Sequence, residues 1–453
     1  MSVMPTLHGE RHMNYRFSLR FTIPLFFLAW ILNPTPGFAE EEKRIYTLQE
    51  SIAEAIAKNW TLGAKGERIE QATLVKEQAR TEFLPKFSTT YGYIRREEEL
   101  TFKSGLGGDI PITTLESFES RTTVRQPVFT GFALLSSFEL AKLGIDRSQM
   151  DFELEKLDLA LRVKEAYFNI LIADKAVEVA EKDVEFRKSN LKVARSFYDV
   201  GMIPINDVLR AEVELADSQQ SLVSARNTAK LSRSAFNTVL SRSINADVDV
   251  EDILTYEPEL VDFDGYVEKA LADRPEIKLI NINILQSDQE TRLAKSKYYP
   301  EIAVSWEYIR EGEDPDVSGD DFHQDPRWQA TAALSWTFWE WGKTRYAVKE
   351  KESVKRELMQ LKMALEESIQ LETKDAVLRL ENAAENIPTT QKAVEQAEEN
   401  LRVNEERYKA QVSTITEVLD AQTLLSRARV NYFRALYNHQ LAKASLKRAL
   451  GTY

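Results

Sequence analysis

The sequence predicts a mixed α+β membrane protein in which one structural pattern occurs twice. Three observations support this fold class. Short motifs recur at a nearly constant distance along the chain, apolar residues recur every seven positions over long stretches, and some segments alternate strictly between apolar and polar residues. Each half is therefore expected to form a long coiled-coil helical hairpin and two transmembrane β-strands.

The first 39 residues predict a signal peptide. Three arginines precede the apolar run FTIPLFFLAWIL (21–32), and small residues around Ala39 suit a cleavage site. A run of 12 residues that contains a proline is too short to span a bilayer as a helix. We therefore expect export and cleavage after Ala39.

The composition excludes several classes of protein. The chain has no cysteine, four histidines and a formal net charge of −13. Disulfide scaffolds, thiolate metal sites and cysteine nucleophiles are excluded, and the acidic balance argues against nucleic acid as a partner. Only His323 and His439 follow the signal peptide, and we expect surface or packing roles for both. We predict no enzymatic activity, no cofactor and no metal.

The internal repeat divides the chain. Repeat 1 is expected over 40–240 and repeat 2 over 263–453, with an acidic, proline-containing linker at 241–262. The motif YDVGMIPINDVLRAE begins at Tyr198, and its counterpart YKAQVSTITEVLDAQ begins 210 positions later at Tyr408. FTGF and WEWG are also 210 positions apart, whereas motifs nearer the start of each repeat are 215 apart. A shorter second loop accounts for this difference.

The helices follow from sevenfold spacing of apolar residues. Val177, Val184 and Leu191 are spaced by seven, and so are their counterparts in the second repeat, a pattern that coiled coils and ordinary helix bundles share. The expected helices are 47–82, 133–197 and 205–240 in repeat 1, and 264–298, 343–407 and 414–450 in repeat 2. Each long helix would measure about 97 Å, close to the summed length of the shorter helices before and after it. Pro388 should kink or break the second long helix.

The strands follow from alternation. In WQATAALSWTF, apolar residues occupy every second position from Trp328, and Trp306 and Tyr308 belong to a similar pattern in the preceding strand. Strands are expected at about 84–96, 117–129, 300–310 and 328–339. A soluble sandwich would also show alternation, but five of the six tryptophans after Ala39 lie between 306 and 341, which favours lipid. The expected aromatic belt consists of Trp306, Tyr308, Trp328, Trp336 and Trp339.

Four strands cannot close a barrel, because about eight are needed. Open strand edges are not tolerated in lipid, where nothing satisfies their backbone groups. Other subunits must therefore complete the sheet, and the functional unit should be an oligomer.

This pattern resembles the TolC family of outer-membrane channel proteins over essentially all of residues 45–451. The resemblance rests on TLQESIAEAIAKN, ADRPEI, FLP and YYP before the strands, QPVFTGF and FWEWGK before the long helices, and the two turn motifs. It implies a homotrimer with a twelve-stranded β-barrel in the outer membrane of a Gram-negative bacterium, continued by an α-helical barrel in the periplasm.

The resemblance also assigns roles at the two turns, which would lie at the periplasmic mouth. Glu417 and Asp420, three residues apart on one helix face, would form the acidic rings of the pore constriction. Tyr408 would make closing contacts with Asn206 and Asp207. The family often has an arginine where this chain has Ser413, so a charged lock there is in question. A simpler interpretation of the two acids is a favourable interaction with the N-terminal helix dipole, after an N-cap at Thr416, worth about 0.3–1 kcal/mol.

The loop at 311–327 matches part of a calcium-binding pattern. Asp314, Asp316, Ser318, Gly319 and Asp325 occupy positions 1, 3, 5, 6 and 12 of an EF-hand loop. Strands rather than helices flank the loop, and the last position carries Asp instead of Glu. We therefore predict a solvated extracellular loop.

The predicted function is a passive exit duct of a tripartite efflux or type I secretion system. Its partners would be an inner-membrane pump, either a proton-driven exporter or an ABC transporter, a periplasmic adaptor and outer-membrane lipid. Drugs, metals, peptides and proteins are all compatible as cargo. The alternative is a periplasmic coiled-coil adaptor or scaffold without a pore, which would be found free in the periplasm.

Overall fold

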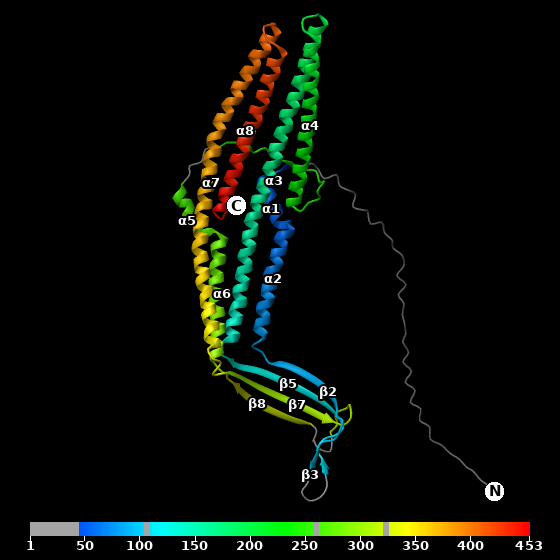
Figure 1. Ribbon diagram of the computed structural model, residues 1–453, viewed down its shortest axis with the longest axis vertical. Helices are drawn as coiled ribbons and strands as arrows, with labels where there is room; N and C mark the ends of the chain where they lie inside the picture. Colours follow the sequence, from blue (N-terminus) through cyan, green and yellow to red (C-terminus); the bar gives the residue numbers. More distant parts are fainter. Residues whose placement is uncertain (1–44, 104–108, 257–261, 320–325) are drawn as a thin grey trace, which may run out of the picture. The chain divides into compact units, whose positions relative to one another are not determined.

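A computed structural model describes residues 45–103, 109–256, 262–319 and 326–453. The expected signal peptide, 1–39, lies outside these residues. Two pairs of long helices and a four-stranded sheet dominate the structure (Figure 1). The helices are α1 (Leu48–Lys58), α2 (Trp60–Thr81), α3 (Ala133–Asp199), α4 (Ile205–Val239), α5 (Phe263–Asp273), α6 (Pro275–Lys295), α7 (Lys343–Lys409) and α8 (Ile415–Ala449). The strands are β1 (Ile45–Tyr46), β2 (Lys86–Arg95), β3 (Thr101–Lys103), β4 (Asp109–Pro111), β5 (Glu116–Thr130), β6 (Asp249–Val250), β7 (Glu301–Gly312) and β8 (Arg327–Ser335).

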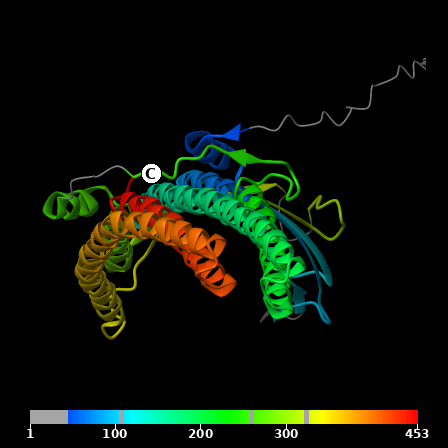
Figure 2. The same cartoon turned by 90° about the horizontal axis from the view of Figure 1, so that it is seen from above.

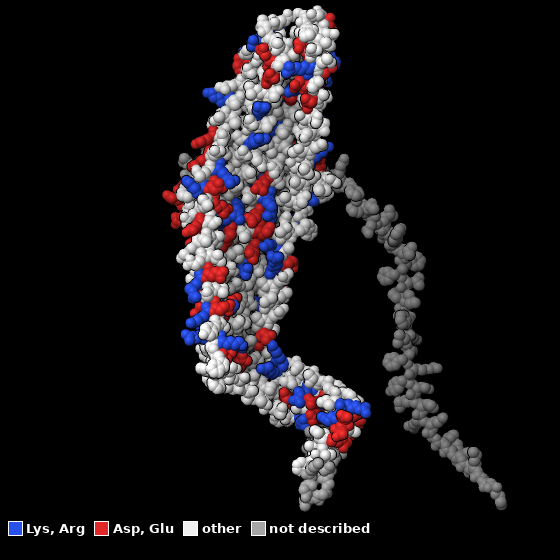
Figure 3. Space-filling view, viewed as in Figure 1, with Lys and Arg blue, Asp and Glu red and all other residues white. Residues whose placement is uncertain are grey.

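The helices repeat the same arrangement in each half. Helices α3 and α7 each contain 67 residues. Helices α2 and α4 both pack on α3, and α6 and α8 both pack on α7. Helix α3 also contacts α6 and α8, which joins the two halves. Acidic and basic side chains are mixed along the exposed helix surfaces, as Figure 3 shows for one face.

The entry to each long helix has the same unusual backbone. Gly131 and Phe132 precede α3 with φ angles of 61° and 71°, and Trp341 and Gly342 precede α7 with 55° and 82°. Two consecutive residues in the left-handed region change the direction of the chain between strand and helix. A glycine at one of the two positions reduces the steric cost of a positive φ. A Cβ on Gly131 would lie 2.4 Å from the carbonyl oxygen of Ser296. These geometric needs explain why FTGF and WEWG match in position.

The sheet has the strand order β2-β5-β7-β8 and is antiparallel throughout. Its register places Phe87, Val124 and Trp306 side by side on one face. Strands β2 and β8 each have a single neighbour and are exposed along their whole length. The sheet of one chain therefore has two open edges.

Strand β8 is shorter than the sequence predicted. It ends at Ser335 instead of 339. The reason is the length of its neighbour, because β7 begins at Glu301, which lies opposite Ser335. Beyond that point no strand among the described residues offers backbone groups for residues 336–339 to pair with.

The predicted linker at 241–262 contains structure of its own. Strand β6 pairs in parallel with β1, and the buried side chains of Val248 and Leu254 belong to an apolar core to which both repeats contribute. The hydroxyl of Tyr167 on α3 lies within hydrogen-bond distance of the carbonyl oxygens of Tyr46 and Glu251, at 3.0 and 2.9 Å. Burial raises the pKa of Tyr167 to about 12. The part of the linker around β6 is thus fixed against α3, and Figure 2 shows α1 and the β6 segment on the same side of the hairpins.

Helix α7 continues through Pro388, so the predicted break does not occur. Proline removes one backbone donor, and the two threonines that follow it bond to neighbouring carbonyls of the same helix. The hydroxyls of Thr389 and Thr390 donate to the carbonyls of Glu385 and Asn386, at 3.3 and 2.8 Å. The carbonyl that loses its helical donor is that of Ala384, four residues before the proline, and the helix nevertheless continues on both sides of it.

Candidate functional site: the tips of the two helical hairpins

Each hairpin ends in the same turn. Gly201 and Gln411 have φ angles of 77° and 61°, and each donates its backbone N–H to the tyrosine three residues earlier, at 2.8 and 2.9 Å. The next residue of each turn donates one residue further back, to Phe197 and Arg407. In this pattern a residue in the left-handed conformation follows the helix end, and the last carbonyl groups of the helix accept hydrogen bonds from the turn. The repeated motif therefore encodes one backbone turn, used twice.

The helix after the second turn begins at Ile415, one residue after the predicted start at 414, but its N-cap differs from the one the sequence suggested. Thr414, not Thr416, is the N-cap of α8, and its side chain makes no capping hydrogen bond. Ile415 is already helical and is only 1% exposed, because it packs in an apolar cluster at the tip. The burial of Ile415, rather than a capping hydrogen bond from a hydroxyl group, thus fixes where the helix begins.

The two predicted ring acids lie on the exposed side of α8. Both Glu417 and Asp420 are exposed. Glu417 accepts a hydrogen bond from the Ser413 hydroxyl at 3.0 Å and pairs with Arg407 of α7 at 3.3 Å. Part of the charge of Glu417 is therefore balanced within its own hairpin. Ser413, where the sequence lacked the expected arginine, holds Glu417 by a neutral hydrogen bond.

Tyr408 contributes to the contact between the two hairpins near their tips. Its side chain is 6% exposed, whereas its counterpart Tyr198 is 42% exposed. The ring of Tyr408 packs against Phe197 of α3 with centroids 5.6 Å apart. Its buried hydroxyl has no hydrogen-bond partner among the described residues. Burial and the negative charge of Asp207 raise the pKa of Tyr408.

The predicted closing contacts of Tyr408 with Asn206 and Asp207 stay a prediction. Asn206 is exposed and Asp207 is half-buried. In the described part of the chain, no hydrogen bond joins Tyr408 to either residue. A different contact joins the turns, because the Gln411 amide lies 3.4 Å from the sulfur of Met202.

A polar cluster behind the tips was not predicted. Arg187 on α3 is buried and bonds to Asp183 of the same helix at 2.8 Å, to Glu214 of α4, and to the hydroxyl of Thr423 on α8 at 3.2 Å. Asp183 also accepts a hydrogen bond from Gln422 of α8 at 2.9 Å. We call these five residues the hairpin clamp. It links three helices from both repeats.

The sequence contained a signal for the hairpin clamp. In the heptad series of Val184 and Leu191, Arg187 occupies the second apolar position of the heptad, and charged residues are rare there. Its counterpart in the second repeat is Ala397. A charged residue that lies between helices in only one of the two repeats indicates a specific contact between those helices.

The predicted aromatic belt is only partly on the sheet. Trp306, Tyr308 and Trp328 share the apolar face, where Tyr308 pairs with Trp328 and stacks on Trp306 at 6.2 Å. Trp336 and Trp339 lie beyond the end of β8 in the segment that leads to α7. The indole of Trp336 donates to the carbonyl of Tyr298 at 3.2 Å.

The opposite face of the sheet is polar. Arg121 of β5 bonds to Glu119 at 2.8 Å and to Glu307 of β7 at 2.9 Å. Gln329 of β8 donates to Glu307 at 2.8 Å. An apolar aromatic face and a hydrogen-bonded charged face are what a strand pattern with one lipid side and one water side predicts.

The described residues contain no group of three or more side chains suited to a metal ion. Asp314 and Asp316 of the calcium-like loop are within the described residues, but Asp325 and His323 lie outside them. His439 is buried, and its ring lies 5.2 Å from that of Tyr256, which agrees with a packing role. None of the described helices is both long and apolar enough to cross a membrane.

Comparison with known proteins gives consistent results. Residues 51–241 and 266–452 match the profile of a family described as outer membrane efflux protein. The chain is 23% identical over 350 residues to the pyoverdine export outer membrane protein OpmQ of Pseudomonas putida, covering 75% of this chain and 71% of that protein. It is 21% identical over 321 residues to nodulation protein T of Rhizobium leguminosarum bv. trifolii, covering 69% and 67%.

Solved structures show the same fold. The outer membrane channel CmeC of Campylobacter jejuni has a TM-score of 0.75 at 16% identity, with 89% of this chain and 85% of that chain covered. The open state of the Neisseria gonorrhoeae channel MtrE has a TM-score of 0.72 at 19% identity, with 89% of each chain covered.

Proposed function

The chain belongs to the outer membrane efflux protein family, within which it is an outer-membrane efflux channel, and we propose that it works as the passive homotrimeric exit duct of a tripartite efflux or type I secretion system. An inner-membrane pump would supply the energy, and a periplasmic adaptor would connect the pump to the helices. The helical hairpins would lie in the periplasm, and the sheet in outer-membrane lipid.

The observation that carries this proposal is the open sheet. One chain supplies four strands with an aromatic face, a charged face and two unpaired edges. Three chains joined edge to edge would supply twelve strands and leave no edge open, which a lipid environment requires. The aromatic face would then meet lipid and the charged face would line the water-filled interior.

The alternative function is that of a periplasmic adaptor without a pore. It does not explain why one face of the sheet is aromatic. OpmQ is named as an export outer membrane protein and CmeC as an outer membrane channel, which supports the duct. Membrane fractionation separates the two functions. If the protein is an exit duct, it should be recovered in the outer-membrane fraction. Its recovery as a free protein in the periplasmic fraction would contradict the proposed function.

At the tips, we propose that Glu417 and Asp420 form acidic rings at the pore constriction. Three copies would place six carboxylates around a narrow opening, which raises the local concentration of cations. Arg407 already pairs with Glu417 at 3.3 Å. Asp420 should therefore contribute more to the field than Glu417.

The test is block of single-channel conductance by a multivalent cation in planar bilayers. Asp420→Ala should weaken the block more than Glu417→Ala, and the double variant should weaken it most. Asp217→Ala is the matched control, because Asp217 is an exposed acid on α4 of the other hairpin. Equal block in the double variant and the unmodified protein would refute the acidic rings.

A further inference from the structure

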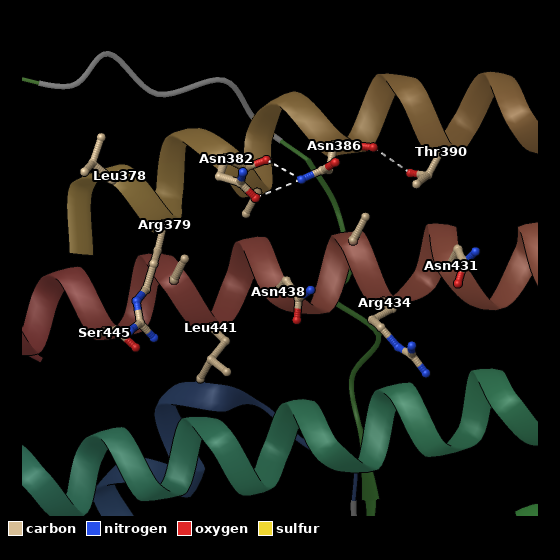
Figure 4. A pocket seen from close by; sticks show the side chains of 13 residues that line it. Leu378, Arg379, Asn382, Asn386, Thr390, Asn431, Arg434, Asn438, Leu441 and Ser445 are labelled. Atoms are coloured by element: carbon tan, nitrogen blue, oxygen red, sulfur yellow. Dashed lines mark hydrogen bonds between the residues drawn. The ribbon is translucent and has the colours of Figure 1, made fainter. Parts of the chain in front are cut away.

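A groove with a volume of about 680 Å³ runs between α7 and α8. Its floor includes Ala383, Ala435 and Ala442, which are buried. Because alanine fills little space between two helices, the groove is hollow there. Figure 4 shows longer polar side chains from both helices around this floor.

The lining is polar and cationic. It contains the guanidinium groups of Arg379 and Arg434 and four asparagines, Asn382, Asn386, Asn431 and Asn438. No carboxylate lines the groove, although the chain as a whole carries a net charge of −13. The groove is therefore a local cationic site in an acidic protein.

The two arginines differ in their partners. Arg379 pairs with Asp375 on the same helix at 2.7 Å. Arg434 is exposed, and the described residues provide it with no ion pair or hydrogen bond. An unpaired guanidinium retains all five of its N–H donors for a solute.

Helix packing does not require these residues, because the first repeat builds the same hairpin without them. The residues 210 positions earlier are Asn169, Ile172, Ala176, Ser221, Ser224 and Thr228. Arg434 and all four asparagines thus replace small, hydroxyl or apolar side chains, whereas Arg379 replaces the amide of Asn169. The cationic lining is specific to the second repeat.

The groove faces away from the linker. On α8, His439 packs against Tyr256 and Gln440 donates to the carbonyl of Thr255 at 2.8 Å. Since a helix turns about 100° per residue, Arg434 lies roughly 140° around the helix from His439. Figure 2 shows the hairpins as a curved wall with the β6 segment and α1 on its convex side. The groove is therefore on the concave side.

We propose that this groove is a binding site for small organic anions that carry carboxylate groups. The guanidinium of Arg434 would bind a carboxylate through two parallel hydrogen bonds, and the amides of Asn431 and Asn438 would donate to the remaining lone pairs of its two oxygens. The amide of Asn386 already donates to Asn382. The position of the site on the inner wall of a tunnel rests on the proposed function, but binding to the groove does not. In the duct, the three grooves of a trimer would hold anionic cargo away from the acidic tips.

The experiment measures fluorescence anisotropy of carboxyfluorescein with the purified full-length protein in detergent at about 0.15 M salt, where long-range attraction is screened. Arg434→Gln should weaken binding about tenfold, because a charge-assisted pair is lost. Arg434→Lys should restore part of the affinity, since it keeps the charge but loses the two-point geometry. Cationic rhodamine 6G should bind no more weakly to Arg434→Gln than to the unmodified protein.

The matched control is Arg226→Gln, which removes an exposed arginine paired with Glu181 on the first hairpin. Its affinity for carboxyfluorescein should be unchanged. Equal affinities for the unmodified protein and Arg434→Gln, or an equal loss in the control, would overturn the site. Conductance in bilayers tests the duct separately, so failure of one proposal is distinguishable from failure of the other.

Discussion

Removal of Arg187 should loosen the contact between the two hairpins. Arg187 is the centre of the hairpin clamp, with bonds to Asp183 on its own helix, Glu214 on α4 and Thr423 on α8. Its side chain is only 8% exposed. Arg187→Ala leaves two carboxylates without their cation and opens a cavity in the seam.

The size of the effect follows from how far these carboxylates are buried. Removing one partner of a buried ion pair costs about 3–5 kcal/mol. The side chain of Asp183 is 14% exposed and keeps its hydrogen bond from Gln422, and that of Glu214 is 34% exposed. Water therefore compensates part of the loss, and we expect about 3 kcal/mol, the lower end of that range.

Hydrogen exchange of the full-length protein measures this loss locally. Amides of α8 around Gln422 and Thr423 should exchange roughly 100-fold faster in Arg187→Ala, because each 1.4 kcal/mol is about a factor of ten. Arg226→Ala is the control, since its ion pair with Glu181 is exposed on both sides and should contribute less than about 1 kcal/mol. Exchange within about threefold of the unmodified protein would refute the clamp.

Two further predictions concern backbone geometry and a buried charge. Gln411→Gly should raise the free energy of unfolding by about 1 kcal/mol and Gly201→Ala should lower it by a similar amount, because both positions have positive φ. Chemical denaturation measures both changes. A loss of stability in Gln411→Gly would contradict backbone strain at this position. Burial, with a smaller contribution from Lys447, lowers the pKa of Lys164 to about 8. The unfolded chain binds this proton up to about pH 10.4, so stability should rise between pH 8 and 10.4. Lys164→Met should therefore add about 3 kcal/mol below pH 8 and progressively less above it; an equal gain at pH 7 and pH 10 in denaturation curves would exclude this origin.

Much of the helical architecture could be predicted because it depends on patterns that extend over many residues. Sevenfold apolar spacing located α3 and α7, and the repeat itself located both turns. Short pairings carried no such signal. Strands β1 and β6 contain two residues each, and what fixes them is the distant side chain of Tyr167. A periodic pattern cannot encode a contact of that kind.

The sequence was less informative about which side of each hairpin is covered. Tyr198 and Tyr408 occupy matching positions in matching turns, yet only Tyr408 is buried. Its burial comes from Phe197 of the other repeat, and the repeat pattern shows the face of a helix but not its neighbour. For the same reason, the sequence placed Glu417 and Asp420 on a common face without revealing that Arg407 pairs with one of them.

The divergence between the two repeats marks the residues that act in the proposed duct. What the repeats share is backbone geometry, such as the positive φ at Gly201 and Gln411. What they do not share includes two charges, because Arg187 corresponds to Ala397 and Arg434 to Ser224. A charge that only one copy carries is not needed to build the hairpin, which the other copy forms without it. Such positions are where selection for transport can act without loss of the fold, and the clamp and the groove should therefore alter function before they alter architecture.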